Sequence, residues 1–288
     1  MSRAYASVII PAHNEASTIE SCLRALLDDP HGDQLDVVVV CNGCTDDTAE
    51  RARRVPGPIR VIESAEPSKA AALELGRTCA TSNPRMYVDA DVVVSPNAVT
   101  AVAEVLQRPG IHAAAPRVLM ASPDASRPMR LFLDIWLRAP YFRDNLIGAG
   151  FYAVSDEGHQ RMGAFPRIVA DDLFALTRFR PEERAVAEGA TFSPLVSRRL
   201  RDVVTVEVRR EAARREFDEW AALHGATVPD DRDTTWLVHL ARDPRRWPGL
   251  AVFVGTKTLI RLRAVRRRRS ADPQAWSRDE HARATVQP

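Results

Sequence analysis

The chain has 288 residues, and its 40 basic and 38 acidic side chains leave a formal net charge of only +2. A hydrophobic content of 45% with 27% charged residues is ordinary for a globular protein and argues against global disorder. The length suffices for one large domain or two small ones, whose cores need no disulfide or metal to hold them.

The N-terminal sequence bears on the compartment. Its first apolar run ends at Pro11 and is too short for a signal peptide, and no stretch reaches the ~18 apolar residues of a membrane span. We therefore expect a cytoplasmic protein whose four cysteines are reduced. Cys41 and Cys44 have the C-x-x-C spacing of redox motifs, but we favour their interpretation as two small residues in a tight loop.

Strand and helix patterns alternate in the first third of the chain. Apolar runs predict strands over residues 5–11, 36–40, 59–62 and 86–88. Helical spacing of apolar side chains predicts helices over residues 16–28, 46–54 and 68–79, the last of them capped by Ser68. This alternation predicts an α/β fold, with a doubly wound, mostly parallel sheet that carries helices on both faces.

The composition changes farther along the chain. Residues 131–179 hold nine of the 18 aromatic side chains, most of which we interpret as core and some as the wall of an acceptor site. Residues 242–288 carry 12 basic and 4 acidic side chains, a net charge of +8 that leaves −6 for the rest. We predict one domain over 1–195, with halves at about 1–92 and 93–195, and a mainly helical, basic extension over 196–288.

Polar side chains follow three of the predicted strands. Residues 13–15 follow the first strand, Asn42 follows the second, and residues 89–91 follow the fourth. Ligands of doubly wound sheets bind beyond the carboxyl ends of the strands. We therefore expect these side chains to lie together in one crevice.

Asp89 and Asp91 are the strongest candidates for metal chemistry. Two carboxylates at positions i and i+2 after a buried strand would repel each other without a cation. Mg²⁺ or Mn²⁺ favours one or two carboxylates together with phosphate oxygens of a substrate. The position at a strand end favours this interpretation over a solvated turn.

Asn42 and Lys69 are candidates for ligand contacts. The amide of Asn42 both donates and accepts hydrogen bonds, which suits a nucleobase edge or a ribose hydroxyl. Lys69 lies at a predicted helix start, where the helix dipole disfavours a cation, so that a carbonyl or phosphate partner is a plausible reason for its place. The alternative for Lys69 is an exposed surface side chain.

Asp171 and Asp172 stand among apolar residues. Adjacent carboxylates in such a setting should have raised, split pKa values, which suits a general base. A capping pair at the start of a helix explains them nearly as well. Gly148, Ala149 and Gly150 indicate a close approach of the backbone to a ligand or to a neighbouring strand.

Taken in order, these motifs resemble the inverting glycosyltransferases of family 2, which have the GT-A fold. The resemblance covers about residues 5–195 and is carried by VIIPAHNE (8–15), NGCTDDT (42–48), SKAAAL (68–73), Asp89-Ala90-Asp91, Gly148-Ala149-Gly150 and Asp171-Asp172.

The resemblance implies a nucleotide-diphosphate sugar donor and a divalent metal, Mg²⁺ or Mn²⁺. It implies a donor pocket lined by Pro11, Ala12, His13, Asn14, Glu15, Asn42, Lys69, Asp89, Ala90 and Asp91. Asp91, with Asp89, would hold the metal, and residues 148–150 would form an acceptor or sugar loop. Asp172 would be the catalytic base, with Asp171 in place of the family's Glu.

Two departures from the family bear on the substrate. The family usually has two Asp residues where this chain has Cys41 and Asn42, so UDP, GDP and dTDP all stay open as the donor nucleotide. The Gln-x-x-Arg-Trp motif of processive synthases is absent, so we expect transfer of a single sugar to a hydroxyl acceptor, with a lipid-linked acceptor as one option.

Other functions stay open on the sequence alone. A nucleotidyltransferase would need a glycine-rich loop after the first strand, which residues 11–15 do not provide. A retaining transferase and a non-catalytic nucleotide-sugar or membrane-surface binder are further alternatives. The apolar-to-basic run over 247–269 suits a helix on the anionic inner face of a membrane or a solvated helix, and we expect no nucleic-acid partner.

Overall fold

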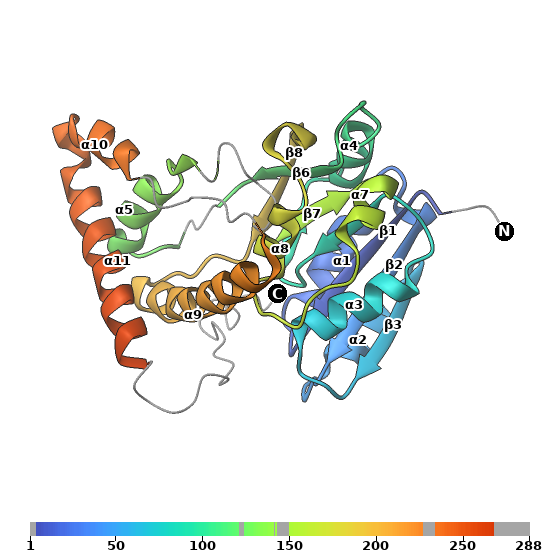
Figure 1. The fold of residues 1–288 in the computed structure, drawn as a ribbon. Coiled ribbons are helices and arrows are strands. Elements are labelled where there is room, and N and C mark those ends of the chain that lie inside the picture. The colour runs from blue at the N-terminus through green and yellow to red at the C-terminus, as the bar shows by residue number, and fades with distance from the viewer. Residues whose placement is uncertain (1–3, 121–123, 141, 143–149, 227–233, 268–288) are drawn as a thin grey trace. The chain divides into compact units, whose positions relative to one another are not determined.

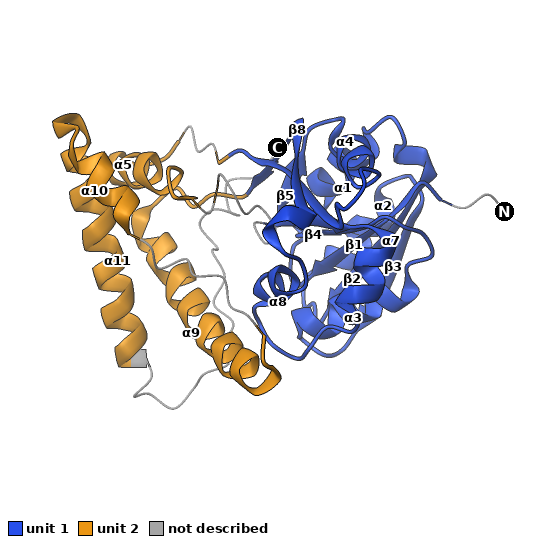
Figure 2. Cartoon of the chain, turned by 45° about the horizontal axis from the view of Figure 1, so that its top comes forward, with its two compact units in different colours: residues 1–119, 146–194 blue, residues 120–145, 195–288 orange. Residues whose placement is uncertain are grey.

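The computed structural model of the chain describes residues 4–120, 124–140, 142, 150–226 and 234–267. The chain divides into two compact units, which Figure 2 shows in different colours. Unit 1 comprises residues 1–119 and 146–194, and unit 2 comprises residues 120–145 and 195–288.

The described strands of unit 1 form one sheet in the order β3-β2-β1-β4-β7-β6-β8-β5 (Figure 1). Its first four strands are β1 (Ala6–Ala12), β2 (Leu35–Asn42), β3 (Ile59–Ser64) and β4 (Arg85–Val88). β1 pairs in parallel with β2 on one side and with β4 on the other, and β2 pairs in parallel with β3. The carboxyl ends of these strands therefore lie at one edge of the sheet.

Helices cover both faces of this parallel part, as the sequence predicted. They are α1 (Ile19–Leu27), α2 (Thr48–Arg54), α3 (Lys69–Cys79) and α4 (Ala98–Val105). Val37 and Val39 share a core with α1, α2 and α4, whereas Val38 and Val40 pack with Ala72 of α3, because alternate side chains of a strand point to opposite faces.

The rest of the sheet is mixed, with β5 (Val92–Val94), β6 (Ala113–Val118), β7 (Phe151–Val154) and β8 (Arg184–Pro194). β7 runs antiparallel to β4 and β6, β5 runs antiparallel to β8, and β6 and β8 are parallel. The helices of this part are α7 (Asp156–Met162) and α8 (Asp171–Thr177). Unit 1 also has 3₁₀ turns at Gly32–Gln34, just before β2, and at Pro181–Glu183, just before β8.

Unit 2 is helical within the described residues, with α5 (Arg127–Trp136), α9 (Leu200–His224), α10 (Thr235–Ala241), a 3₁₀ turn (Pro244–Arg246) and α11 (Trp247–Arg267). Its core is built on Phe132 of α5, which stacks on Phe253 of α11 with the ring centroids 5.4 Å apart. A partly buried ion pair joins α9 to α11, because Lys257 Nζ lies 2.8 Å from Glu207 Oε2.

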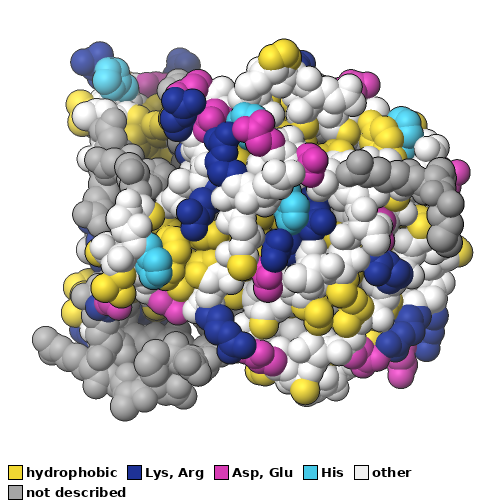
Figure 3. Space-filling view, turned by 45° about the vertical axis from the view of Figure 1, so that its right-hand side comes forward, with side chains coloured by type: hydrophobic (Ala, Val, Ile, Leu, Met, Phe, Trp, Pro, Cys, Tyr) yellow, Lys and Arg dark blue, Asp and Glu magenta, His cyan; other side chains and the backbone are white. Residues whose placement is uncertain are grey.

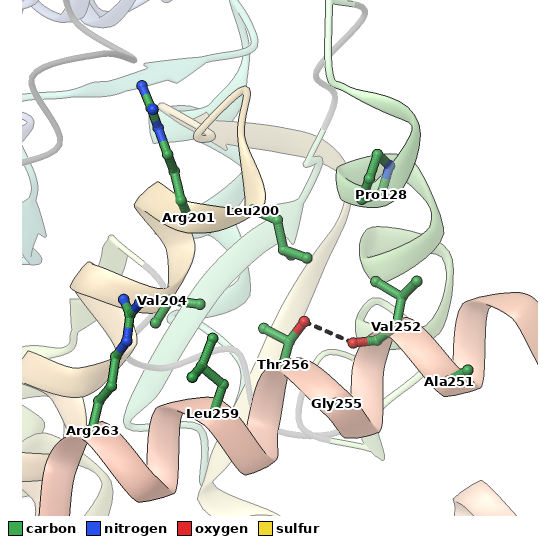
Figure 4. A pocket seen from close by; sticks show the side chains of 10 residues that line it. All are labelled: Pro128, Leu200, Arg201, Val204, Ala251, Val252, Gly255, Thr256, Leu259 and Arg263. Carbon is green, nitrogen blue, oxygen red and sulfur yellow. Dashed lines mark hydrogen bonds between the residues drawn. The ribbon is translucent and has the colours of Figure 1, made fainter.

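A pocket of about 410 Å³ opens between α5, α9 and α11 (Figure 4). Leu200, Val204 and Leu259 contribute apolar lining, and the side chains of Arg201 and Arg263 lie on one side of it. Its walls are thus mainly apolar, with cationic groups to one side.

The compact units differ from the predicted domains, whose bounds stay a prediction: residues 120–145 belong to unit 2, where the apolar face of α5 packs against α11. One expectation about the first strand is corrected by the structure. Pro11 does not end the first strand, which continues to Ala12 along β2. The pairing of β1 with β4 ends at Ile9, so Pro11 lies beyond the last residue that pairs with β4.

Within the described residues, none of the helices combines the length and the apolar character that crossing a bilayer requires.

Candidate active site

The loops that follow β1 and β2 are joined by hydrogen bonds. His13 Nδ1 donates to the carbonyl oxygen of Asn42, 2.5 Å away. Asn14 Oδ1 accepts from the Thr45 backbone N–H at 2.6 Å, and Asn14 Nδ2 donates to Thr45 Oγ1 at 3.1 Å. Asn14 has a φ of 53°, a left-handed conformation that asparagine tolerates better than most residues. The two loops therefore form one surface at the carboxyl edge of the sheet.

Three other predicted pocket residues lie largely inside the fold. Pro11 and Ala12 are buried within β1. The Glu15 backbone N–H donates to Thr48 Oγ1 at 2.7 Å, and its carboxylate accepts from Thr18 Oγ1 at 2.9 Å. Glu15 thus anchors the start of α1, and its direct role in ligand binding stays a prediction.

Asn42 ends β2 and is only 2% exposed. Its side-chain oxygen Oδ1 is buried, and no described residue donates a hydrogen bond to it. An unsatisfied buried acceptor costs about 1–3 kcal/mol, so the site favours a ligand that brings an N–H or O–H donor.

Lys69 begins α3 and bridges two carboxylates. Ser68 caps the helix as predicted, with Oγ accepting from the Ala71 backbone N–H. Lys69 Nζ lies 2.8 Å from Asp89 Oδ1 and 3.2 Å from Asp171 Oδ1. Burial disfavours the ammonium, but the carboxylates of Asp171 and Asp89 outweigh that effect and hold the pKa of Lys69 above its usual range.

Residues 89–91 form the turn between β4 and β5. The Asp89 backbone N–H donates to the Gly150 carbonyl oxygen at 2.8 Å. Gly150 has a φ of +108°, and a Cβ added there would lie 3.0 Å from Val92 Cγ2, so a glycine is needed for this close approach. Ala90 is buried. Gly148 and Ala149 lie outside the described residues.

Asp171 and Asp172 are the first two residues of α8. Asp171 is buried, and its burial raises its pKa. The Lys69 ammonium opposes this shift, whereas the charges of Asp172 and Asp89 add to it, so that the pKa of Asp171 is about 6. Asp172 is more exposed, and its Oδ1 accepts from the Leu173 backbone N–H at 2.8 Å. The pair therefore lies at a helix start and also faces the Asp89 turn through Lys69.

Several carboxylates gather around one lysine in this cluster. Asp171, Asp89 and Asp172 all raise the pKa of the Lys69 ammonium. No group of three or more His, Cys, Asp or Glu side chains in the described part of the chain is arranged to hold a metal alone. Asp89 and Asp91 are the residues that could hold a cation together with oxygen atoms of a ligand, and this assignment stays a prediction.

The sequence comparison decides the family. Residues 7–161, just over half of the chain, match the sequence profile of glycosyl transferase family 2. The chain belongs to this family. It is a glycosyltransferase, and its α/β sheet is the GT-A fold.

Solved glycosyltransferase structures share this fold. The mannosyltransferase PcManGT from Pyrobaculum calidifontis, solved with GDP-Man and Mn²⁺, is 20% identical and has a TM-score of 0.58, covering 94% of this chain and 77% of its own. TarS residues 1–349 from S. aureus, solved with UDP, are 16% identical and have a TM-score of 0.52. That match covers 70% of this glycosyltransferase and 63%, less than two thirds, of the TarS chain. Searching the curated proteins gave no significant match.

Two tyrosines near the candidate site of this glycosyltransferase were missed from the sequence. Tyr87 of β4 and Tyr152 of β7 stack with ring centroids 5.0 Å apart, and neither buried hydroxyl has a hydrogen-bond partner among the described residues. Burial, and then the negative charges of Asp171 and Asp172, raise the pKa of Tyr152 well above its usual range. The available signal was a tyrosine in an otherwise apolar strand, which by itself also suits a core residue.

Proposed function

We propose that this glycosyltransferase moves a single sugar from a nucleotide-diphosphate sugar to a hydroxyl acceptor, with inversion at the anomeric carbon. One observation carries the proposal. Lys69 joins the Asp89 turn to Asp171 at the start of α8, so that the acid pair and the D-x-D turn belong to one cluster.

Asp172 is the proposed base. Asp171 is buried and bound to Lys69, whereas Asp172 is more exposed and lies next to it on α8. Asp172 would take the proton of the acceptor hydroxyl, whose oxygen then attacks the anomeric carbon from the side opposite the diphosphate. That attack forms the new glycosidic bond as the bond to the diphosphate breaks, and it inverts the configuration.

The proposed donor pocket is the surface made by the loops after β1 and β2. The buried acceptor Asn42 Oδ1 suits an N–H of the base or a ribose hydroxyl. The presence of UDP in the TarS structure and of GDP-Man in the PcManGT structure supports a nucleotide-sugar donor for this chain. UDP, GDP and dTDP remain the candidates.

Asp91 and Asp89 are the proposed metal ligands, and the Mn²⁺ in the PcManGT structure supports a divalent metal for this chain. When bound, Mg²⁺ or Mn²⁺ would stabilise the negative charge of the departing diphosphate. Lys69 would orient Asp89 by its 2.8 Å contact.

The function is tested with purified protein, Mn²⁺ and a panel of UDP-, GDP- and dTDP-sugars. We expect the sugars of one nucleotide to raise the unfolding temperature of the protein. The protein should also hydrolyse these nucleotide sugars, at least slowly, and so release nucleoside diphosphate. A chelator should abolish that release, and product analysis with an accepted acceptor should find an inverted anomeric centre. Release of pyrophosphate from a nucleoside triphosphate and a sugar phosphate, with none from nucleotide sugars, would contradict the proposal.

We further propose a lipid-linked acceptor and peripheral contact with the anionic inner face of a membrane. α11 exposes Trp247, Val254, Leu262 and Val265, whose spacing keeps them on one helical face. Exposed arginines of the same helix supply cationic groups, and the apolar pocket has two arginines to one side. An apolar face with arginines suits a lipid surface that carries phosphate groups.

A further inference from the structure

Cys41 and Cys44 lie on either side of a constrained turn. Cys41 is 1% exposed in β2, whereas Cys44 is partly exposed in the turn that follows. Between them, Gly43 has a φ of +60°, and a Cβ added there would lie 2.7 Å from Pro67 Cβ. The turn is therefore fixed in a conformation that L side chains rarely adopt, with one thiol inside and one thiol accessible.

Both cysteines lie beside the end of β1. Cys41 pairs with Ala12 in the parallel ladder of β1 and β2. Cys44 Sγ also donates to the Ala12 carbonyl oxygen and accepts from the Asn14 backbone N–H, both at 3.4 Å. The Cys44 sulfur thus ties the end of β1 to the loop after β2.

Cys44 is the more reactive thiol. The neighbouring Cys41 thiol lowers its pKa, burial opposes this, the Asn14 N–H lowers it further, and the result is about 7. The neighbouring Cys44 thiol and burial raise the pKa of Cys41. Burial likewise raises the pKa of Cys22. Because the thiolate is the attacking species, Cys44 is prepared to react at neutral pH.

We propose that Cys41 and Cys44 form a thiol–disulfide exchange pair, with Cys44 as the attacking and Cys41 as the resolving thiol. The Cys44 thiolate attacks one sulfur of a low-molecular-weight disulfide, which expels one thiolate and leaves a mixed disulfide on Cys44. Cys41 then gives up its proton and attacks the Cys44 sulfur, which releases the second thiol. The two cysteines are oxidised, and the small disulfide is reduced to two thiols.

Oxidation changes the loop after β1. In the disulfide, Cys44 no longer donates to Ala12, and its contact with the Asn14 N–H is altered. The turn with Asn14 loses two of its restraints, so the oxidised protein should bind its donor less tightly. This consequence rests on the proposed function, because it assumes that residues 12–15 contact the nucleotide.

The chemistry is tested on the full chain in buffers of reduced and oxidised glutathione, with alkylation and peptide mass spectrometry. The Cys41–Cys44 disulfide should accumulate as the oxidised fraction rises and should disappear with dithiothreitol. Cys41→Ser should trap a glutathione mixed disulfide on Cys44, whereas the control Cys79→Ser should leave formation of the Cys41–Cys44 disulfide unchanged. The proposed exchange pair would be overturned if both Cys41 and Cys44 were still alkylated in fully oxidised buffer. It would also be overturned if Cys44 and Cys79 took up glutathione equally.

The consequence is tested by titrating UDP-glucose and GDP-mannose, with Mn²⁺, into the reduced and the oxidised protein. We expect about tenfold weaker binding of one of them by the oxidised form, equivalent to ~1.4 kcal/mol. Equal affinity of both forms would overturn the link between oxidation and binding. Failure of both nucleotide sugars to bind even the reduced form would count against the proposed donor site, while the mass spectra still decide the thiol chemistry.

Discussion

Both lysines of the chain bind buried carboxylates. Of 40 basic residues only Lys69 and Lys257 are lysine. Lys69 lies 2.8 Å from Asp89 and 3.2 Å from Asp171, and Lys257 lies 2.8 Å from the buried Glu207. A lysine presents a compact charge on a flexible stem, whereas arginine presents a broad planar fork, so a site that must reach two carboxylates from one point favours lysine.

Asp171 gives stability a defined pH dependence. Its pKa in the folded protein is about 6, against 3.8 for an unperturbed side chain, so the folded state binds more protons between these values. The protonated Asp171 carboxyl therefore contributes to the free energy of unfolding, and this contribution is lost as the pH rises from about 4 to about 6. Relative to the wild type, Asp171→Asn should gain up to about 3 kcal/mol across this window.

Urea unfolding at a series of pH values, with a chelator present, measures that difference. Asp28→Asn is the matched control, because it makes the same substitution at an exposed position outside the cluster. A constant difference between Asp171→Asn and the wild type from pH ~4 to ~7 would show that Asp171 does not titrate as its burial requires.

The elements of the parallel half were predictable because their signals are local. Apolar runs marked β1 to β4, helical periodicity marked α1 to α3, and Ser68 was found at its cap. The strand ends in turn brought the loops of His13, Asn14 and Asn42 together. These features need only the neighbouring residues and the rule that parallel strands end at one edge.

The long-range features could not be predicted. Periodicity identifies the apolar face of α5, but it does not say that Phe132 will stack on Phe253 of another helix far along the chain. In the same way, nothing near Lys69 in the sequence indicates Asp171 as its partner. The division of residues 93–195 between two units has the same origin.

The packing of α5 on α11 gives an element-scale prediction. Phe132 is fully buried, so Phe132→Ala should lower the free energy of unfolding of unit 2 by about 3–5 kcal/mol through lost contacts and a cavity. Its neighbour Leu131 is 38% exposed, and Leu131→Ala should cost about 0.5 kcal/mol or less. Denaturant unfolding monitored by tryptophan fluorescence measures both, and equal losses for the two variants would contradict the assigned core.

The near-neutral total charge of the chain conceals an uneven distribution. The net charge is +8 over residues 242–288 and −6 over the rest. On the face shown in Figure 3, basic and acidic side chains are interspersed and apolar side chains gather in small groups. An attraction to anionic surfaces is therefore expected from the C-terminal segment and not from the molecule as a whole.

Vesicle sedimentation tests this expectation. Binding should be stronger to vesicles with phosphatidylglycerol than to phosphatidylcholine alone, and should weaken as salt rises from about 0.05 to about 0.5 M. Arg266 is exposed on α11, and Arg266→Gln should weaken binding by about 1 kcal/mol, or roughly fivefold. Arg108→Gln, at an exposed position of unit 1, is the control and should bind normally. Equal binding to both vesicle types would contradict the proposed membrane contact.

The central claim is that Asp172 removes the proton of the acceptor while the rest of the cluster holds the donor. The most direct test compares transfer rate and donor affinity in the wild type and in Asp172→Asn, with the donor identified by the panel. The transfer rate should fall by about 10²–10⁴-fold, with the donor dissociation constant unchanged within about threefold and product from the wild type inverted. Transfer by Asp172→Asn at close to the wild-type rate would contradict the account.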